Sequence, residues 1–398
     1  MFSALLIVGL LVAAFVGFNI GGSSTGVAFG PAVGSRVVSK LAAAGLMTGF
    51  ALLGGWTVGR NVVETMGGQI VPQDYFTLTA SVAILFFIGL ALLISNLFGV
   101  PASTSMTAVG AIAGLGVATG SIDWAVMGRI VSWWLVSPIL AFWVCAVIGR
   151  YLYPYLDHWF ALDRSDGAFI ELDRSGTFPW PRLGENVSRR NLIGGLLVIA
   201  IGCYMAFSAG ASNVANAIAP LYGNGAITMN QGILLAGAAI GLGAFTIARR
   251  TLDTVGNDLT DLPILAALIV EVVSASLITG LSYLGIPASL AVSATMCIIG
   301  LGWGRATRTV TISKVASAAV RGTSKTPTAE DGGVSVNALA ARRERRSVPR
   351  IGEEQPGEIS ASELFDPQAT GKVMMLWLLT PTLAGVASYL LFRFAPFV

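Results

Sequence analysis

The sequence predicts an all-α protein that crosses a membrane many times and consists of two inverted copies of one unit. Three observations support this class. Of the 398 residues, 54% are hydrophobic and only 11% are charged, long apolar stretches follow one another along the chain, and short motifs recur in the same order in both halves. Soluble domains carry about 25% charged residues. With so few charged residues, the chain cannot form the polar surface of a soluble domain of this size. Its surface must therefore face mainly lipid.

Membrane helices need about 20 mostly apolar residues, and these candidates are predicted along the chain: 2–20, 37–58, 76–99, 124–149, 192–209, 228–247, 262–284 and 372–395. Shorter apolar pieces at 25–35, 104–119, 213–222 and 290–304 are interrupted by Gly, Ser and Pro. Irregular backbone at membrane depth must be surrounded by protein or line a cavity. We therefore expect broken helices or re-entrant hairpins there, and about 10–12 membrane segments in all.

Two stretches are polar instead. Residues 151–191 form a charged connection, and residues 305–371 are rich in charge, Gly, Ser and Pro, so the second stretch is predicted to be a largely disordered loop. Ten Lys or Arg lie between 305 and 350. The positive-inside rule places this loop and the 151–191 connection in the cytoplasm, and both termini outside the cell membrane.

Short motifs repeat with nearly constant spacing. The pairs are GGSSTGVAFGP at 21–31 with GASNVANAIAP at 210–220, GRNVVETMG at 59–67 with ARRTLDTVG at 248–256, FGVPAS at 98–103 with LGIPAS at 284–289, and WLVSP at 134–138 with WLLTP at 377–381. The spacing is 189, 189, 186 and then 243 residues, because the charged loop is inserted in the second copy only.

These matches define repeat 1 as residues 1–150 and repeat 2 as residues 192–304 with 372–398. The first-half counterpart of the basic loop, LGVATGSID, has no basic residue and suits the outside. Equivalent loops on opposite faces predict inverted copies, as in many secondary transporters.

The paired proline breaks, PASTSM at 101–106 and PASLAV at 287–292, are the first candidate site. A helix that begins at mid-membrane directs free N–H groups and a positive dipole end toward the break. Hydroxyl groups there add neutral donors, which suits a small oxyanion. The predicted substrate-binding residues at the breaks are Ser103, Thr104, Ser105, Ser289 and Ser293. The structural alternative is a proline kink with a serine cap.

The GGSSTGV and GASNVAN stretches are the second candidate, because each places side-chain oxygens inside an apolar run. Ser212, Asn213 and Asn216 are predicted to bind substrate. Ser23, Ser24 and, again, Asn213 are predicted to bind a coupling ion. The alternative is close helix packing through small residues, although buried asparagines cost more than packing requires.

Charged residues at membrane depth are the third candidate, because such groups are functional hypotheses by default. Glu271 stands far from any polar end of its span, whereas Glu64 and Asp253 lie in the repeated Arg-containing motif, where Arg60 and Glu64 can pair. All three acids are predicted coupling-ion residues, with interfacial ion pairs as the alternative for the last two. The tryptophans Trp133, Trp134 and Trp377 are assigned to packing or to the membrane interface, with no role in the site. No nucleotide-binding loop, catalytic triad or metal cluster is recognisable, so we expect no enzyme activity, catalytic residue, cofactor or nucleic-acid partner.

The stretch GASNVANA resembles the duplicated GANDVANA hallmark of the inorganic phosphate transporter (PiT) family, and both proline breaks resemble its Pro-x-Ser-Thr-Thr-His motifs. The resemblance implies secondary transport of phosphate driven by Na⁺ or H⁺, a midplane site between inverted repeats, and a homodimer. The chain departs from the hallmark, because Ser23-Ser24 and Ser212-Asn213 replace Asn-Asp, and because Met106 and Val292 replace the histidines.

These departures keep alternatives open. Hard cations prefer carboxylate oxygens, and both hallmark aspartates are absent. Some family members resemble sulfate permeases, and a site with fewer proton acceptors suits sulfate, which carries no proton near neutral pH. A passive channel and a transport-dead sensor that works through residues 305–371 are the alternatives of another class.

Overall fold

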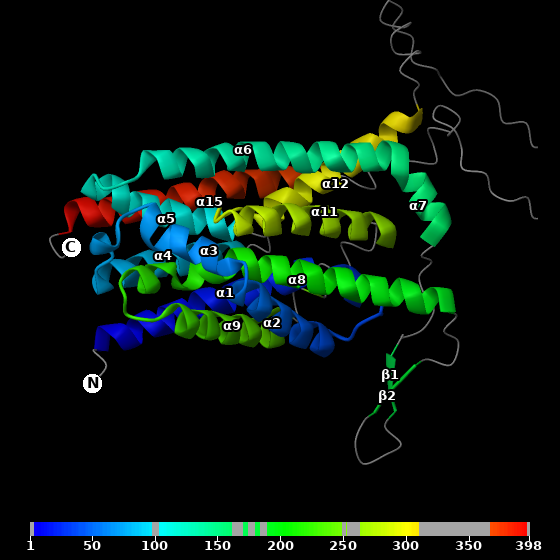
Figure 1. The fold of residues 1–398 in the computed structure, drawn as a ribbon, viewed down its shortest axis with the longest axis horizontal. Helices are drawn as coiled ribbons and strands as arrows, with labels where there is room; N and C mark the ends of the chain where they lie inside the picture. The colour runs from blue at the N-terminus through cyan, green and yellow to red at the C-terminus, as the bar shows by residue number, and fades with distance from the viewer. Residues whose placement is uncertain are drawn as a thin grey trace, which may run out of the picture.

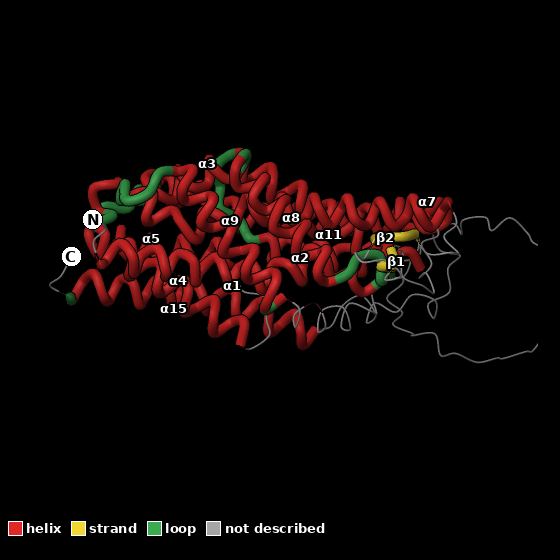
Figure 2. Tube along the Cα trace, turned by 90° about the horizontal axis from the view of Figure 1, so that it is seen from below, coloured by secondary structure: helices red, strands yellow, loops and turns green. Residues whose placement is uncertain are grey.

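The computed structural model describes residues 4–97, 103–160, 170–173, 180–183, 189–248, 252, 263–309 and 367–395. The described residues form an elongated bundle of helices that lie roughly along one axis (Figure 1). Both ends of the chain lie at one end of this axis, and helix α7 and a small hairpin lie at the other (Figures 1 and 2). The predicted all-α membrane architecture is confirmed.

The first half contains α1 (Ala4–Gly34), α2 (Lys40–Trp56), α3 (Gly59–Glu64), the π-helical turn η1 (Thr65–Gln69), the 3₁₀ turn η2 (Gln73–Tyr75), α4 (Leu78–Leu97), α5 (Thr104–Thr119) and α6 (Trp124–Val147). The connection contains the π-helical turn η3 (Ile148–Leu152), α7 (Tyr153–Phe160) and strands β1 (Ile170–Asp173) and β2 (Trp180–Leu183). The second half contains α8 (Arg189–Gly223), α9 (Met229–Thr246), α11 (Ile264–Tyr283), α12 (Leu290–Ala306), η5 (Thr307–Thr309) and α15 (Pro367–Phe394).

Membrane-spanning helices dominate this fold. Among the described residues, six helical segments are long and apolar enough to cross a bilayer, and the bent pair formed by α2 and α3–η1 makes a seventh. Helices α5 and α12 are apolar but shorter, and α15 has 28 residues. The apolar side chains that these helices leave exposed, such as Leu135 and Ile139 on α6, suit contact with lipid.

Two predicted interruptions are wrong. The GGSSTGV stretch lies inside α1, a continuous helix of 31 residues, and GASNVAN lies inside α8, which has 35. The small polar residues are compatible with a helix because their hydroxyls bond back to the preceding turn. Thr25 Oγ1 donates to the Gly21 carbonyl over 2.7 Å, and Ser23 Oγ donates to the Asn19 carbonyl over 3.2 Å.

Glycines in these stretches serve close packing between the halves. A Cβ atom on Gly21 of α1 would lie 1.9 Å from the carbonyl oxygen of Ile240 in α9, and one on Gly210 of α8 would lie 2.0 Å from that of Ala51 in α2. The two glycines are 189 residues apart, and so are the two carbonyls, so the crossings are equivalent under the repeat. Helices α1 and α8 run in opposite directions along the bundle (Figure 1), as inverted copies require.

The proline breaks are confirmed as helix starts. Helix α4 ends at Leu97 and α5 begins at Thr104, with Ser103 as its N-cap residue. Helix α11 ends at Tyr283 and α12 begins at Leu290 after Ser289. The break residues 98–102 lie outside the described residues.

The connection between the halves contains an antiparallel hairpin that was not predicted. Ile170 pairs with Leu183, and Asp173 pairs with Trp180. Its alternating sequence, IELD, has the period of a strand, but four residues are too few to stand out among charged and aromatic neighbours. Most of the 305–371 loop lies outside the described residues, so its predicted disorder stays a prediction.

Candidate functional site

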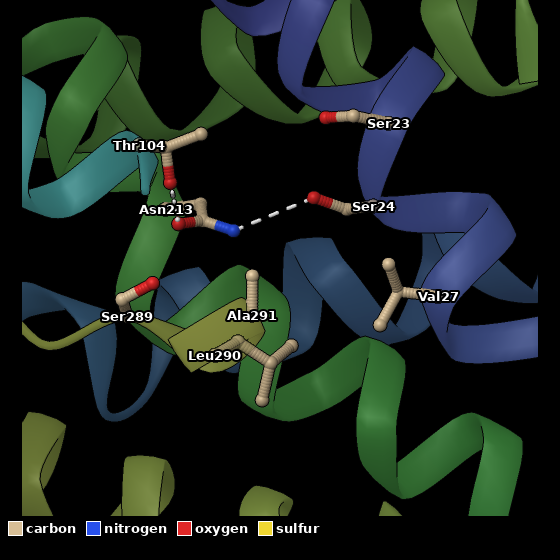
Figure 3. Close-up of a pocket in the computed structure, with 8 residues that line it drawn as sticks. All are labelled: Ser23, Ser24, Val27, Thr104, Asn213, Ser289, Leu290 and Ala291. Atoms are coloured by element: carbon tan, nitrogen blue, oxygen red, sulfur yellow. Dashed lines mark hydrogen bonds between the residues drawn. The ribbon is translucent and has the colours of Figure 1, made fainter. Parts of the chain in front are cut away.

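A small pocket lies where four helices meet, and Figure 3 shows its lining. The lining residues are Ser23, Ser24, Val27, Thr104, Asn213, Ser289, Leu290 and Ala291. They come from α1, α5, α8 and the start of α12, and therefore from both halves of the chain. The cavity has a volume of about 30 Å³.

The two short helices both begin at this pocket. Thr104 is the first residue of α5, and Ser289 is the N-cap residue of α12. The two starts are not equivalent, because Ser289 Oγ accepts a 3.3 Å hydrogen bond from the Val292 amide, whereas Ser103 makes no such cap. The first amides of α5 are therefore free of side-chain capping and available to an anion.

Asn213 is the centre of a buried hydrogen-bond network on the α8 wall. Its Oδ1 accepts from Thr104 Oγ1 over 2.6 Å and from Asn216 Nδ2 over 3.2 Å. Its Nδ2 donates to Ser24 Oγ over 3.5 Å, so the amide bridges α5 and α1 across the pocket (Figure 3). This bridge joins the α5 and α1 walls of the pocket through one side chain of α8.

A second chain of hydrogen bonds lies behind the first. Asn216 Nδ2 donates to Ser105 Oγ over 3.3 Å, Ser105 and Ser212 are 3.0 Å apart, and Ser212 Oγ donates to the Ala288 carbonyl over 2.7 Å. Each hydroxyl has one proton, so the direction is fixed and Ser105 donates to Ser212. This chain joins α8 to both proline breaks.

Two buried polar atoms near the pocket have no hydrogen-bond partner in the described part of the chain. They are Ser103 Oγ and Asn216 Oδ1, and both residues are 0% exposed. A buried orphan polar atom costs about 1–3 kcal/mol. Neither residue lines the pocket itself, and each lies next to or is hydrogen-bonded to a residue that does.

None of the lining residues is ionisable. The predicted intramembrane charge, Glu271, lies on α11 rather than in the lining. Its side chain is 5% exposed, and no described residue makes a hydrogen bond to Oε1. A carboxyl group in this setting requires a proton or a cation for compensation.

Other predicted residues lie elsewhere. Ser293 is buried one turn into α12 and does not line the pocket. Glu64 is exposed on α3. Arg60 does not make the anticipated pair with it, because its guanidinium donates to the Trp56 carbonyl over 2.7 Å and also to Asn230 Oδ1. Asp253 lies outside the described residues.

The sequence prediction missed the apolar part of the lining, which consists of Val27, Leu290 and Ala291. The signal was present, because these residues occupy motif positions where the family pattern has Asn, Thr and Thr. No group of three or more His, Cys, Asp or Glu residues in the described part of the chain could hold a metal ion. The three cysteines, Cys145, Cys203 and Cys297, are buried and free.

Comparison with known proteins gives concordant matches. The sulfate permease CysP of Bacillus subtilis (strain 168) is 30% identical over 297 residues, which cover 74% of this chain and 77% of that protein. A putative phosphate permease of Helicobacter pylori (strain ATCC 700392 / 26695) is 25% identical over 370 residues, which cover 75% of this chain and 68% of that protein.

A solved structure, titled the sodium-dependent phosphate transporter, shares the fold. Its TM-score is 0.66 with 17% sequence identity, and the match covers 98% of both chains. The family profile described as the phosphate transporter family matches residues 20–171 and 177–323. These residues include the small-residue helices, the proline breaks and the whole pocket. The chain therefore belongs to the phosphate transporter family.

Proposed function

We propose that this protein is a secondary active permease for inorganic phosphate, with an oxyanion site in the pocket between α1, α5, α8 and α12. The observation that carries the proposal is the meeting of two mid-bundle helix starts at one uncharged, hydroxyl-lined pocket. The dipole ends and hydroxyls stabilise an anion without binding it as tightly as a full positive charge would. Release to the other side then remains fast enough for transport.

Coupling to a cation follows from the charge of the substrate. An anion in this low-dielectric site carries a large desolvation cost that neutral donors offset only in part. A co-transported Na⁺ or H⁺ supplies the missing positive charge. The orphan oxygens of Ser103 and Asn216 and the buried carboxyl of Glu271 are the groups that we assign to this task. Ser23, Ser24 and Asn213 supply further oxygen atoms from the lining.

Alternating access is proposed to arise from two inverted copies. The equivalent α1–α9 and α8–α2 crossings support this, because each half packs its first helix against the second helix of the other half. A site at the junction is exposed to one side or the other when one half rocks against the other.

Orientation is proposed from charge. The end of the bundle that carries α7 and the hairpin (Figure 1) also carries basic residues such as Arg150, Arg305 and Arg308. The positive-inside rule makes this the cytoplasmic end. Both termini then lie outside the cell membrane.

Uptake by proteoliposomes tests the function. Purified protein should accumulate labelled phosphate against its gradient when an inward Na⁺ or H⁺ gradient is imposed, and the two gradients applied separately identify the coupling ion. Uptake that only equilibrates the two sides would indicate a passive channel instead. Absence of uptake for every oxyanion would favour a sensor, which deletion of residues 310–366 would then test.

Sulfate is the second candidate substrate. Two observations favour it: the pocket has no carboxylate that could accept a proton from monohydrogen or dihydrogen phosphate, and the B. subtilis relative at 30% identity is named a sulfate permease. Unlabelled sulfate and phosphate in competition against each labelled ion decide between them. The preferred substrate should displace the other at the lower concentration.

A further inference from the structure

Trp134 connects the first half of the chain to the proline break of the second half. Its indole Nε1–H donates a 2.8 Å hydrogen bond to the carbonyl oxygen of Pro287, which is 153 residues away along the chain. Trp134 lies on α6, and Pro287 lies two residues before Ser289, the N-cap of α12. The indole therefore contacts the backbone immediately before a segment that lines the pocket.

Backbone carbonyls at a break have no helical partner, and inside a membrane no bulk water can replace one. The two carbonyls before Ser289 are both satisfied by side chains from other helices. Trp134 binds the Pro287 oxygen, and Ser212 binds the Ala288 oxygen over 2.7 Å. These two bonds fix the position of the extended segment from which α12 starts, and with it the α12 residues that line the pocket.

The repeat supplies a counterpart with a different environment. Trp377 occupies the equivalent place in WLLTP, 243 residues later. It is 8% exposed, and its Nε1 has no hydrogen-bond partner among the residues that the structure describes. Pro101, the counterpart of Pro287, lies outside the described residues. Within the described part of the chain, Trp134 thus makes a side-chain hydrogen bond that its counterpart Trp377 does not make.

We propose that Trp134 is a positioning residue for the substrate site: its indole N–H holds the Pro287 carbonyl and so fixes the start of α12 against the pocket. The role depends on the donor atom and not on the bulk of the ring. The proposal rests on the proposed function for its transport readout, but its structural part stands independently.

Trp134→Phe removes the donor and leaves an aromatic ring. A lost hydrogen bond to a buried carbonyl corresponds to about a tenfold weakening of substrate binding. We expect the KM for phosphate, or for sulfate if that is the transported ion, to rise about tenfold with Vmax within about twofold. Trp377→Phe is the matched control, and removal of an unpartnered buried N–H should change KM by less than about twofold.

Trp134→His distinguishes the effect of the hydrogen-bond donor from the effect of ring packing. Histidine fills less space than phenylalanine but retains a ring N–H. If the hydrogen bond positions the site, KM for Trp134→His lies closer to wild type than KM for Trp134→Phe. If packing alone matters, the order is reversed, and the proposal is overturned. Equal KM shifts in Trp134→Phe and Trp377→Phe would overturn it as well.

Hydrogen–deuterium exchange provides a readout that does not need transport. Backbone amides of residues 286–293 should exchange faster in Trp134→Phe than in wild type, while exchange in Trp377→Phe is unchanged over these residues. Unchanged exchange in Trp134→Phe contradicts the positioning role. If wild-type protein transports no oxyanion but this exchange difference is found, the proposed function fails and the positioning role survives.

Discussion

The two halves of this protein agree in their packing and differ in their polar chemistry. The agreement is close, because the crossing of Gly21 with Ile240 is repeated by that of Gly210 with Ala51 at the same spacing of 189 residues. The same holds for Gly54 with Phe207 and its repeat, the crossing of Gly243 with Phe18. In each crossing, a glycine of one half packs directly against a backbone carbonyl of the other half, so all four crossings contribute to the contact between the halves.

The polar residues do not follow this symmetry. Thr104 and Ser105 begin α5, but the equivalent positions of α12 hold Leu290 and Ala291. Asn213 and Asn216 in α8 correspond to Ser24 and Val27 in α1, and the buried Glu271 corresponds to Leu85. Both copies of each element nevertheless contribute polar groups to the lining, with Ser23 and Ser24 from α1, Thr104 from α5, Asn213 from α8 and Ser289 from the start of α12. We infer that duplication produced the scaffold, whereas the two copies now place unlike side chains at equivalent positions of the site.

The largest effect is expected where the halves agree. Gly21→Ala and Gly210→Ala each place a Cβ atom 1.9 Å or 2.0 Å from a backbone oxygen, which cannot relax by a side-chain rotation. We expect each to destabilise the protein by about 3 kcal/mol, equally in both halves, as measured by thermal unfolding in detergent. Gly49→Ala is the control, since nothing lies within 4 Å of its Cβ position. A large loss in only one of the two variants would break the proposed equivalence.

The next effect concerns the buried carboxyl group of Glu271, which has no equivalent in the first half. Glu271→Gln keeps the shape of the side chain and removes its charge. If Glu271 takes part in coupling, gradient-driven accumulation should fall at least about thirtyfold, in keeping with about 2 kcal/mol or more for a buried charged partner, while substrate exchange between equal concentrations persists. Glu64→Gln, at an exposed carboxyl, should leave both within about twofold. The reverse result would assign coupling to Glu64.

A third prediction exchanges the unlike residues at the two helix starts. Thr104→Val removes a pocket hydroxyl and its 2.6 Å bond to Asn213, so we expect about a tenfold loss of affinity for the transported oxyanion. Leu290→Thr places a hydroxyl at the matching position of α12. If the N-terminus of α5 is the main anion-binding helix start, the double variant Thr104→Val/Leu290→Thr should regain less than half of the affinity that Thr104→Val loses. Full restoration would mean that the two starts are interchangeable.

The sequence was sufficient for the fold class, because the low charge, the apolar spans and the repeat spacing all have direct physical causes. The positions of the helix starts at Ser103 and Ser289 were also predictable, since a proline followed by hydroxyl residues in an apolar run is typical of a helix N-terminus. The same reasoning failed for α1 and α8. Small polar residues can break a helix or permit close crossing, and only the contact of Gly21 with Ile240 decides between these.

The candidate site was predictable in part for a similar reason. Motif positions identified Ser24, Thr104, Asn213 and Ser289, because oxygen atoms are costly to bury in a membrane span unless they bind something. They did not single out Val27, because an apolar residue in an apolar span has no polar atom to bury, although its motif position matches that of Asn216. The bond from Trp134 to Pro287 joins residues 153 positions apart, and the local sequence does not show which of the two tryptophans reaches a backbone carbonyl of a break.

The smallest effect tests the two serines that end the breaks. Ser103 Oγ is buried without a partner, so Ser103→Ala should leave thermal stability unchanged or slightly raised. Any loss of affinity, which we expect to be about fivefold, then reports on substrate or coupling ion alone. Ser289→Ala removes the cap on Val292 and should cost about 1 kcal/mol of stability together with a similar loss of affinity. Isothermal titration calorimetry and thermal unfolding of both variants separate the two effects. Ser103 and Ser289 are the N-cap residues of α5 and α12. If both variants keep the wild-type affinity for phosphate and for sulfate, the oxyanion does not bind at these two helix N-termini.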